Sequence, residues 1–237
     1  MVTTLYLIRH GETEGSGAKR YHGSIDIPLS EKGVEQMRKT SAFVAGHLKN
    51  SASSRHFSYL RDVNRQTAHG DTGTSSEIPG VETARLSAIY CSDLSRAIRS
   101  AGIISDPHGL KAVIVPALRE RSFGIWEGMS FAEIKERYPL EFEAWAADPV
   151  NHSPMEGETT VGVRDRVVAA MDGILRGRDG SNIAVVAHGG VNRIILCHIL
   201  GIPLENIFRV EQDFGAVNII EFWDRYPVVK LVNFRPD

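Results

Sequence analysis

Cysteine is scarce in this chain, and no charge sign dominates it. The 237 residues include only two cysteines, Cys91 and Cys197, each within an apolar stretch, which excludes a disulfide-built scaffold. A formal net charge of −2 gives no electrostatic reason to expect nucleic acid or an anionic membrane as partner. Runs of about 18 apolar residues are also missing, so we expect no membrane-spanning helix. The scarcity of cysteine favours a cytoplasmic location.

The composition is that of a globular protein with a sizeable core. Hydrophobic residues make up 42% of the chain and charged residues 24%. We predict a single domain over residues 1–237, with an insertion at about 50–85. That stretch is rich in Ser, Thr and Gly and lacks sustained periodicity. We expect an appendage there; the alternative is a lid that brings Arg55, Arg61 or Arg65 to a substrate.

Apolar, β-branched runs alternate with helical patterns along the chain. The predicted strands are 3–8, 88–91, 113–116, 182–187, 217–222 and 228–234, the last two separated by a turn containing Pro227. The predicted helices are 30–48, 92–104, 131–145 with a break at Pro139, 160–175 and 191–200. This alternation predicts an α/β fold, a three-layer α/β/α sandwich around a mostly parallel central sheet.

Two of the predicted strands are followed by a histidine and a glycine. One strand runs into Arg9-His10-Gly11 and the other into His188-Gly189-Gly190. Ligands of parallel sheets bind beyond the carboxyl ends of the strands, so both histidines are expected in one crevice. A neutral imidazole can attack phosphorus, although an isolated Arg-His pair is more often a simple strand cap.

The surroundings of these histidines carry a family resemblance. The segments LIRHGETE, YHGSIDIPLSEKG, CSDLSRA, LRERSFGIWEG, EGET and VVAHGGVNR occur in this order. Together they resemble the histidine phosphatase superfamily, also called phosphoglycerate mutase-like, along nearly the whole chain outside 50–85. The resemblance implies the phosphoglycerate mutase-like fold and cleavage of a phosphate monoester through a phosphohistidine. We expect no metal and no other cofactor.

The resemblance also implies roles for five residues. His10 corresponds to the phosphorylated nucleophile, and Arg9 and Arg96 to the guanidinium clamp on the phosphoryl group. His188 corresponds to the second histidine, which donates to a phosphate oxygen. Glu120 corresponds to the proton donor for the leaving oxygen; without the motif it would read as a surface ion-pair residue.

A second set of residues is expected to bind the substrate. Ser16 stands where the family often has asparagine, and a serine can still donate to phosphate although it is shorter. Gly23 fits the family's phosphate-loop position, and His22 before it either reaches the substrate or faces solvent. Gly189 permits close backbone approach.

The resemblance leaves the substrate open. Mutases of the superfamily carry a longer segment after the acid glutamate, whereas 123–154 is compact here, which favours hydrolysis of a small-molecule phosphate ester. FGIWEG and the tail IFRVEQDFGAVNIIEF look similar to α-ribazole phosphatases of cobalamin nucleotide-loop assembly. Alternatives are a sugar-bisphosphate phosphatase, a phosphoglycerate mutase and, from another class, a non-catalytic protein-binding module. A homodimer also stays open.

Overall fold

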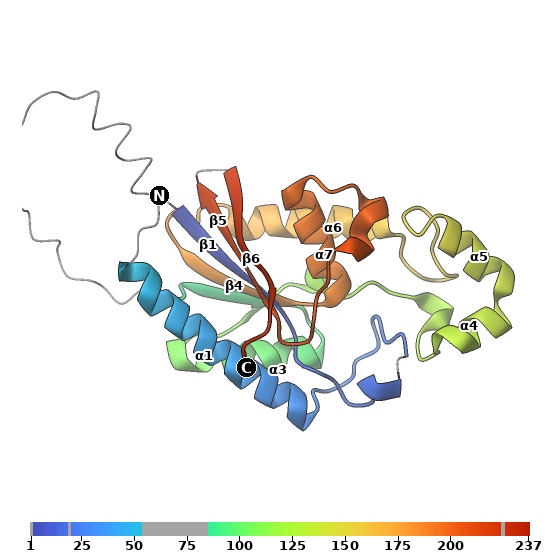
Figure 1. Cartoon of the computed structure of the whole chain (residues 1–237), viewed down its shortest axis with the longest axis horizontal. Coiled ribbons are helices and arrows are strands. Elements are labelled where there is room, and N and C mark those ends of the chain that lie inside the picture. Colours follow the sequence, from blue (N-terminus) through green and yellow to red (C-terminus); the bar gives the residue numbers. More distant parts are fainter. Residues whose placement is uncertain (1, 19, 54–84, 224–225) are drawn as a thin grey trace, which may run out of the picture.

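A single mixed sheet forms the centre of the molecule. The computed structural model describes residues 2–18, 20–53, 85–223 and 226–237 (Figure 1). Within these ranges the sheet has six strands in the order β3-β2-β4-β1-β5-β6. The strands are β1 (Val2–Arg9), β2 (Ala88–Cys91), β3 (Val113–Ile114), β4 (Asn182–Ala187), β5 (Val217–Trp223) and β6 (Tyr226–Phe234). The neighbouring strands β3, β2, β4 and β1 are parallel to one another. Strand β5 is antiparallel to both of its neighbours, β1 and β6. The predicted mostly parallel sheet is therefore confirmed.

Helices cover both faces of this sheet. They are α1 (Glu31–Ser53), α3 (Ser95–Ser105), α4 (Phe131–Arg137), α5 (Pro139–Ala147), α6 (Thr160–Leu175) and α7 (Gly189–Leu200). Figure 1 shows α1 and α3 on one side of the sheet, α6 and α7 on the other, and α4 and α5 extending beyond one end. The predicted three-layer α/β/α sandwich and the helix break at Pro139 are therefore confirmed.

Strand β1 is buried on both faces, with alternate side chains in two separate cores. Leu5 and Leu7 belong to the core under α6 and α7. Tyr6 and Ile8 belong to the core under α1 and α3. Each of these four side chains is at most 1% exposed. Successive strand residues point to opposite faces, so this apolar run fixes the strand at the centre and delivers the next residues to its carboxyl end.

Several helix boundaries differ from the sequence prediction. Helix α7 begins at Gly189, two residues before the predicted start, and the start of α3 and the end of α1 differ most. The helix predicted from Ser92 begins at Ser95, since the Asp26 carboxylate accepts the Ser95 amide at 2.8 Å. The helix predicted to end at 48 continues to Ser53. Its predicted start is confirmed, because the Ser30 hydroxyl accepts the Gly33 amide at 3.1 Å.

Proline placement corrects two further expectations. Pro227 lies within β6, paired with Phe222, and not in a turn. It is tolerated because β6 is an edge strand, where a missing N–H donor leaves no partner unsatisfied. The strand predicted over 113–116 has only Val113 and Ile114, because Pro116 begins a 3₁₀ turn.

Most of the predicted insertion at 50–85 lies outside the described residues.

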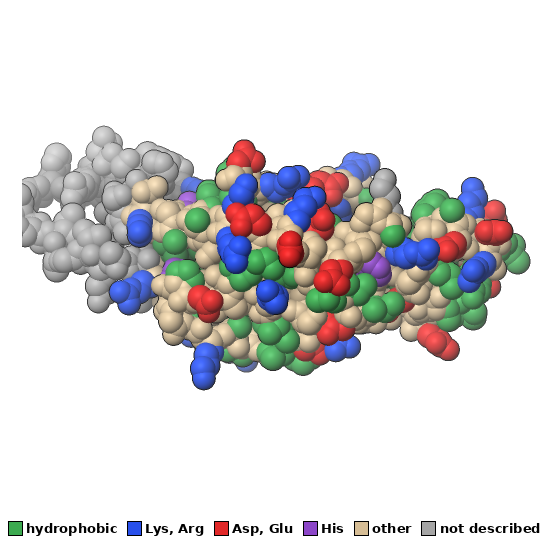
Figure 2. Space-filling model, turned by 90° about the horizontal axis from the view of Figure 1, so that it is seen from below, with side chains coloured by type: hydrophobic (Ala, Val, Ile, Leu, Met, Phe, Trp, Pro, Cys, Tyr) green, Lys and Arg blue, Asp and Glu red, His purple; other side chains and the backbone are tan. Residues whose placement is uncertain are grey.

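Among the helices that the structure describes, none has the length and apolarity needed to cross a membrane. On the face in Figure 2, side chains of both charge signs alternate over the surface.

Candidate active site

His10 sits directly after β1, where the strand leaves the sheet. Its amide donates to the Ala187 carbonyl of β4 at 3.0 Å, and its side chain is only 5% exposed. Imidazole Nδ1 lies 2.7 Å from the Gly11 carbonyl oxygen. Because a carbonyl can only accept, Nδ1 carries the proton and Nε2 holds the lone pair. Burial, reinforced by the Arg9 and Arg96 guanidinium groups, holds the pKa of His10 far below its usual range. The ring is therefore a neutral base with Nε2 available.

His188, at the end of β4, packs against His10. The two ring centroids are 5.1 Å apart in an edge-to-face arrangement. The Ser92 hydroxyl lies 2.7 Å from His188 Nε2, while Nδ1 has no hydrogen-bond partner among the described residues. Burial and the neighbouring His10 lower the pKa of His188 well below its usual range. The structure thus brings together the two histidines that are 178 positions apart in the chain.

Two arginines surround the histidine pair. Arg9 donates from Nη1 to the Gln212 carbonyl, and its Cζ lies 3.8 Å from the centroid of the Phe214 ring. Burial lowers the pKa of Arg9 to about 10, so the group stays charged at neutral pH. Arg96 of α3 is 3% exposed and donates to the carbonyls of Ile25 and Gly23, each at 2.7 Å. Both guanidinium groups are near enough to the imidazoles to lower the pKa of each histidine further, beyond the effect of burial.

Glu120 reaches the same place from the loop after β3. Its carboxylate accepts the Gly190 amide at 2.9 Å and the Arg121 amide at 2.9 Å. A Cβ at Gly190 would lie 2.7 Å from Glu120 Oε1, so glycine is needed for this approach. Arg119 and Arg121 form no ion pair with Glu120. Arg119 binds Asp93 at 2.6 Å, and the Arg121 side chain donates to the Glu158 carbonyl and the Thr160 hydroxyl, each at 2.8 Å. The carboxyl group is therefore oriented by the Gly190 amide at the start of α7 and by the amide of the next residue in the chain, Arg121.

The residues expected to bind substrate fall into two groups. The Gly23 carbonyl accepts from Arg96, and Gly23 has φ +43°, a conformation that favours glycine. Burial, followed by the charge of Arg96, lowers the pKa of His22. A Cβ at Gly189 would lie 3.3 Å from Arg9 Cζ. These three residues therefore lie beside the two arginines.

Ser16 is engaged elsewhere. Its hydroxyl lies 2.8 Å from the Thr13 hydroxyl and donates to the Thr13 carbonyl at 2.8 Å. These bonds close a local turn within the 13–16 segment. Donation from Ser16 to a phosphate would have to replace at least one of them.

Sequence reasoning missed several residues that build the site. Ser92 contacts His188, and Phe214 stacks on Arg9 with its centroid 5.6 Å from that of His10. Glu127 accepts the Ser24 amide at 2.7 Å and the Phe123 amide at 3.0 Å, joining the segment that follows Gly23 to the segment after Glu120. Ser92 and Glu127 stand inside the quoted motifs, so their motif position was the available signal.

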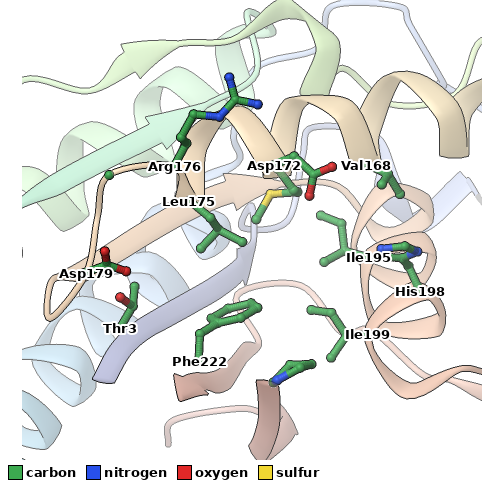
Figure 3. A pocket seen from close by; sticks show the side chains of 13 residues that line it. Thr3, Val168, Asp172, Leu175, Arg176, Asp179, Ile195, His198, Ile199 and Phe222 are labelled. Carbon is green, nitrogen blue, oxygen red and sulfur yellow. The ribbon is translucent and has the colours of Figure 1, made fainter. Parts of the chain in front are cut away.

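A cavity of about 620 Å³ lies at the opposite end of the sheet (Figure 3). It is lined by the beginning of β1 at Thr3, by the last turns of α6 and α7, and by Phe222 of β5. The histidines lie at the carboxyl ends of the parallel strands, so this cavity is separate from them. Among the described residues, no group of three His, Cys, Asp or Glu side chains is placed to hold a metal ion.

The chain is similar to known proteins along most of its length. The model of the histidine phosphatase superfamily (branch 1) matches residues 5–60 and 78–235. An adenosylcobalamin/alpha-ribazole phosphatase of Salmonella typhimurium is 26% identical over 233 residues, covering 98% of this chain and 96% of the relative. Phosphoserine phosphatase 1 of Hydrogenobacter thermophilus is 25% identical, over 97% of this chain and 91% of the relative.

The same architecture occurs in solved structures. The alpha-ribazole phosphatase of Shigella flexneri superimposes with a TM-score of 0.75 at 23% identity, covering 98% of this chain and 96% of that one. At this level of identity the likeness bears on the fold alone. The predicted phosphoglycerate mutase-like fold is confirmed.

Proposed function

Because the chain belongs to the histidine phosphatase superfamily (branch 1) and is a phosphatase, we propose that it hydrolyses a small-molecule phosphate monoester through a phosphohistidine at His10. The observation that carries this proposal is the state of His10. Its Nδ1 is bound by the Gly11 carbonyl, and burial beside two guanidinium groups keeps the ring neutral. A neutral imidazole with a fixed tautomer is the form that attacks phosphorus.

In the first step, His10 Nε2 donates its lone pair to phosphorus as the ester P–O bond breaks. Arg9 and Arg96 bind the non-bridging oxygens, and His188 donates a hydrogen bond to one of them, which stabilises the charge of the transition state. The leaving oxygen takes a proton from the Glu120 carboxyl group, which the Gly190 amide positions beside the arginines. The products are a neutral alcohol, phosphohistidine and the Glu120 carboxylate.

In the second step, water attacks the phosphorus of phosphohistidine. The Glu120 carboxylate accepts the proton of this water as the new P–O bond forms. The P–N bond breaks, and its electron pair returns to His10 Nε2. Inorganic phosphate then leaves, and the protonated Glu120 and neutral His10 are ready for another cycle.

For the substrate we favour α-ribazole 5'-phosphate of cobalamin biosynthesis. A relative with similarity over almost its whole length carries that activity in its name. An aromatic pair also lies near Gly23: the ring centroids of Tyr21 and Phe123 are 4.8 Å apart, and a Cβ at Gly23 would lie 2.9 Å from the Phe123 ring. Partly exposed aromatic rings beside the arginines suit the benzimidazole base of α-ribazole.

Phosphoserine is the second candidate, because a phosphoserine phosphatase is similar to this chain to nearly the same extent. A small charged amino acid would not use the aromatic pair. A sugar-bisphosphate phosphatase and a phosphoglycerate mutase have no comparable support. A protein-binding module fits worst, since all five expected catalytic side chains are present. The homodimer and the cytoplasmic location stay predictions.

A panel of esters tests this choice. We expect the highest kcat/KM for α-ribazole 5'-phosphate when it is compared with phosphoserine, 3-phosphoglycerate and a sugar bisphosphate. Phe123→Ala should lower kcat/KM for α-ribazole 5'-phosphate and spare phosphoserine. A preference for phosphoserine, unaffected by Phe123→Ala, would reject the cobalamin assignment. Phosphoryl transfer to a second phosphoglycerate in place of water would reject hydrolysis.

A further inference from the structure

The loop 210–216, between α7 and β5, forms the support under Arg9. Its Gln212 carbonyl accepts from Arg9 Nη1, and Arg9 Cζ lies over its Phe214 ring, 3.8 Å from the centroid. Arg9 Nε has no hydrogen-bond partner among the described residues. The Gly215 amide also donates to the His10 carbonyl at 3.1 Å. The direction of the Arg9 guanidinium is therefore determined by the position of this loop.

A buried amide pair fastens the loop to β5. Gln212 and Asn218 are both fully buried, and their amide groups bond to each other in both directions, at 2.9 and 2.8 Å. Asn218 also donates to the Leu7 carbonyl of β1 at 2.9 Å. Buried amides are costly unless every polar atom is satisfied, and a satisfied network specifies one arrangement.

The C-terminal strand fastens the same loop from the other side. The Asn233 side chain accepts the Asp213 amide at 2.6 Å and donates to the Asp213 carboxylate at 3.0 Å. The Asn233 amide donates to Asn218 at 2.8 Å, which joins the two attachments. Asn233 has φ +51°, an unfavourable conformation for a residue other than glycine. Such a conformation persists where the surrounding contacts impose it.

We propose that Asn218 and Asn233 are positioning residues for Arg9. They hold the loop 210–216 so that the Gln212 carbonyl and the Phe214 ring direct the guanidinium at the phosphoryl group of the substrate. Both residues act through Arg9 and contact no reacting atom. The inference rests on the proposed phosphatase site, and it assigns to β6 a part in phosphate binding.

Coupling between Asn233 and Arg9 tests this inference. Asn233→Gly removes the side-chain bonds and keeps the positive φ without strain. We expect it to weaken binding of vanadate, a phosphate analogue, about tenfold in wild type and less than twofold in an Arg9→Lys background. Val232→Ala, at an exposed position of the same strand, should change neither value.

Calorimetry measures vanadate binding without turnover, so the test stands even if no ester is hydrolysed and the proposed function fails. Equal weakening in both backgrounds, or none in wild type, would overturn the positioning role. If Asn233→Gly does not fold, Phe214→Leu replaces it, because it removes the ring face and keeps an apolar side chain. The same dependence on Arg9 is then expected, and its absence rejects the inference.

Discussion

The two nitrogens of His10 have different surroundings, and this difference governs the chemistry expected of the residue. Nδ1 is bound by the carbonyl of the next residue, Gly11, and the ring is buried beside two arginines. Burial, reinforced by these arginines, lowers the pKa of the ring, and the same arginines would bind the phosphoryl group. The two arginines would thus act on both the nucleophile, His10, and the electrophile, the phosphoryl group.

Glu120 offers a test at the scale of one side chain. Glu120→Gln should lower kcat/KM on an alkyl phosphate by about 10²-fold or more, because a poor leaving group needs a proton in the transition state. On p-nitrophenyl phosphate the loss should be far smaller, since this leaving group departs without protonation. Glu136→Gln, at an exposed position of α4, is the control. Equal losses on both esters would indicate that Glu120 only positions the substrate.

At the scale of elements, the sequence predicted best those segments whose ends are set by local signals. Helix 160–175 and strand 182–187 have the predicted bounds. The end of α7 at Gly201, with φ +66°, also follows from a local signal. The predicted start of α3 was wrong because Asp26, whose carboxylate accepts the Ser95 amide, is remote from α3 in sequence.

In the candidate site, too, the residues whose roles follow from local sequence motifs were predicted, and those whose roles depend on remote contacts were not. Its five expected catalytic residues could be found because each stands in a short motif. Ser92 and Phe214 also stand in quoted segments, but their roles were missed because these roles depend on contacts between distant parts of the chain. Ser92 and His188, for example, are 96 residues apart. No periodicity or spacing in the sequence encodes such a contact.

Most of the insertion at 50–85 lies outside the described residues, so its predicted role rests on the sequence alone. Replacing residues 54–84 with a short Gly/Ser linker should leave kcat/KM unchanged, because all quoted motifs lie outside this range and the family model passes over 61–77. Shortening such a connection changes loop-closure entropy only slightly. Steady-state kinetics and thermal unfolding check both points. A large rise in KM with the fold intact would support the lid.

For the whole molecule, the buried neutral histidines link stability to pH. Burial lowers the pKa of His10 and His188 well below 6.5 in the folded state, so only the unfolded chain binds protons there as pH falls. Their effect is absent above pH about 6.5. Below it, each histidine should lower the free energy of unfolding by up to about 1.4 kcal/mol per pH unit.

Urea unfolding at pH 7.0 and 5.5 measures this effect. His188→Gln, which cannot titrate, should show a smaller loss of stability between the two pH values than the wild type. His198→Gln, at an exposed position of α7, is the matched control and should behave as the wild type. An identical loss in all three proteins would show that His188 does not stay neutral.

The central claim is that His10 carries the phosphoryl group during turnover. The most direct measurement is rapid quenching with a ³²P-labelled ester, followed by peptide mapping of the labelled protein. We expect label that is stable in alkali, labile in acid and located on His10. His10→Asn should lose both label and turnover, whereas His198→Gln should keep both. Label on another residue, or substantial turnover by His10→Asn, would contradict the account.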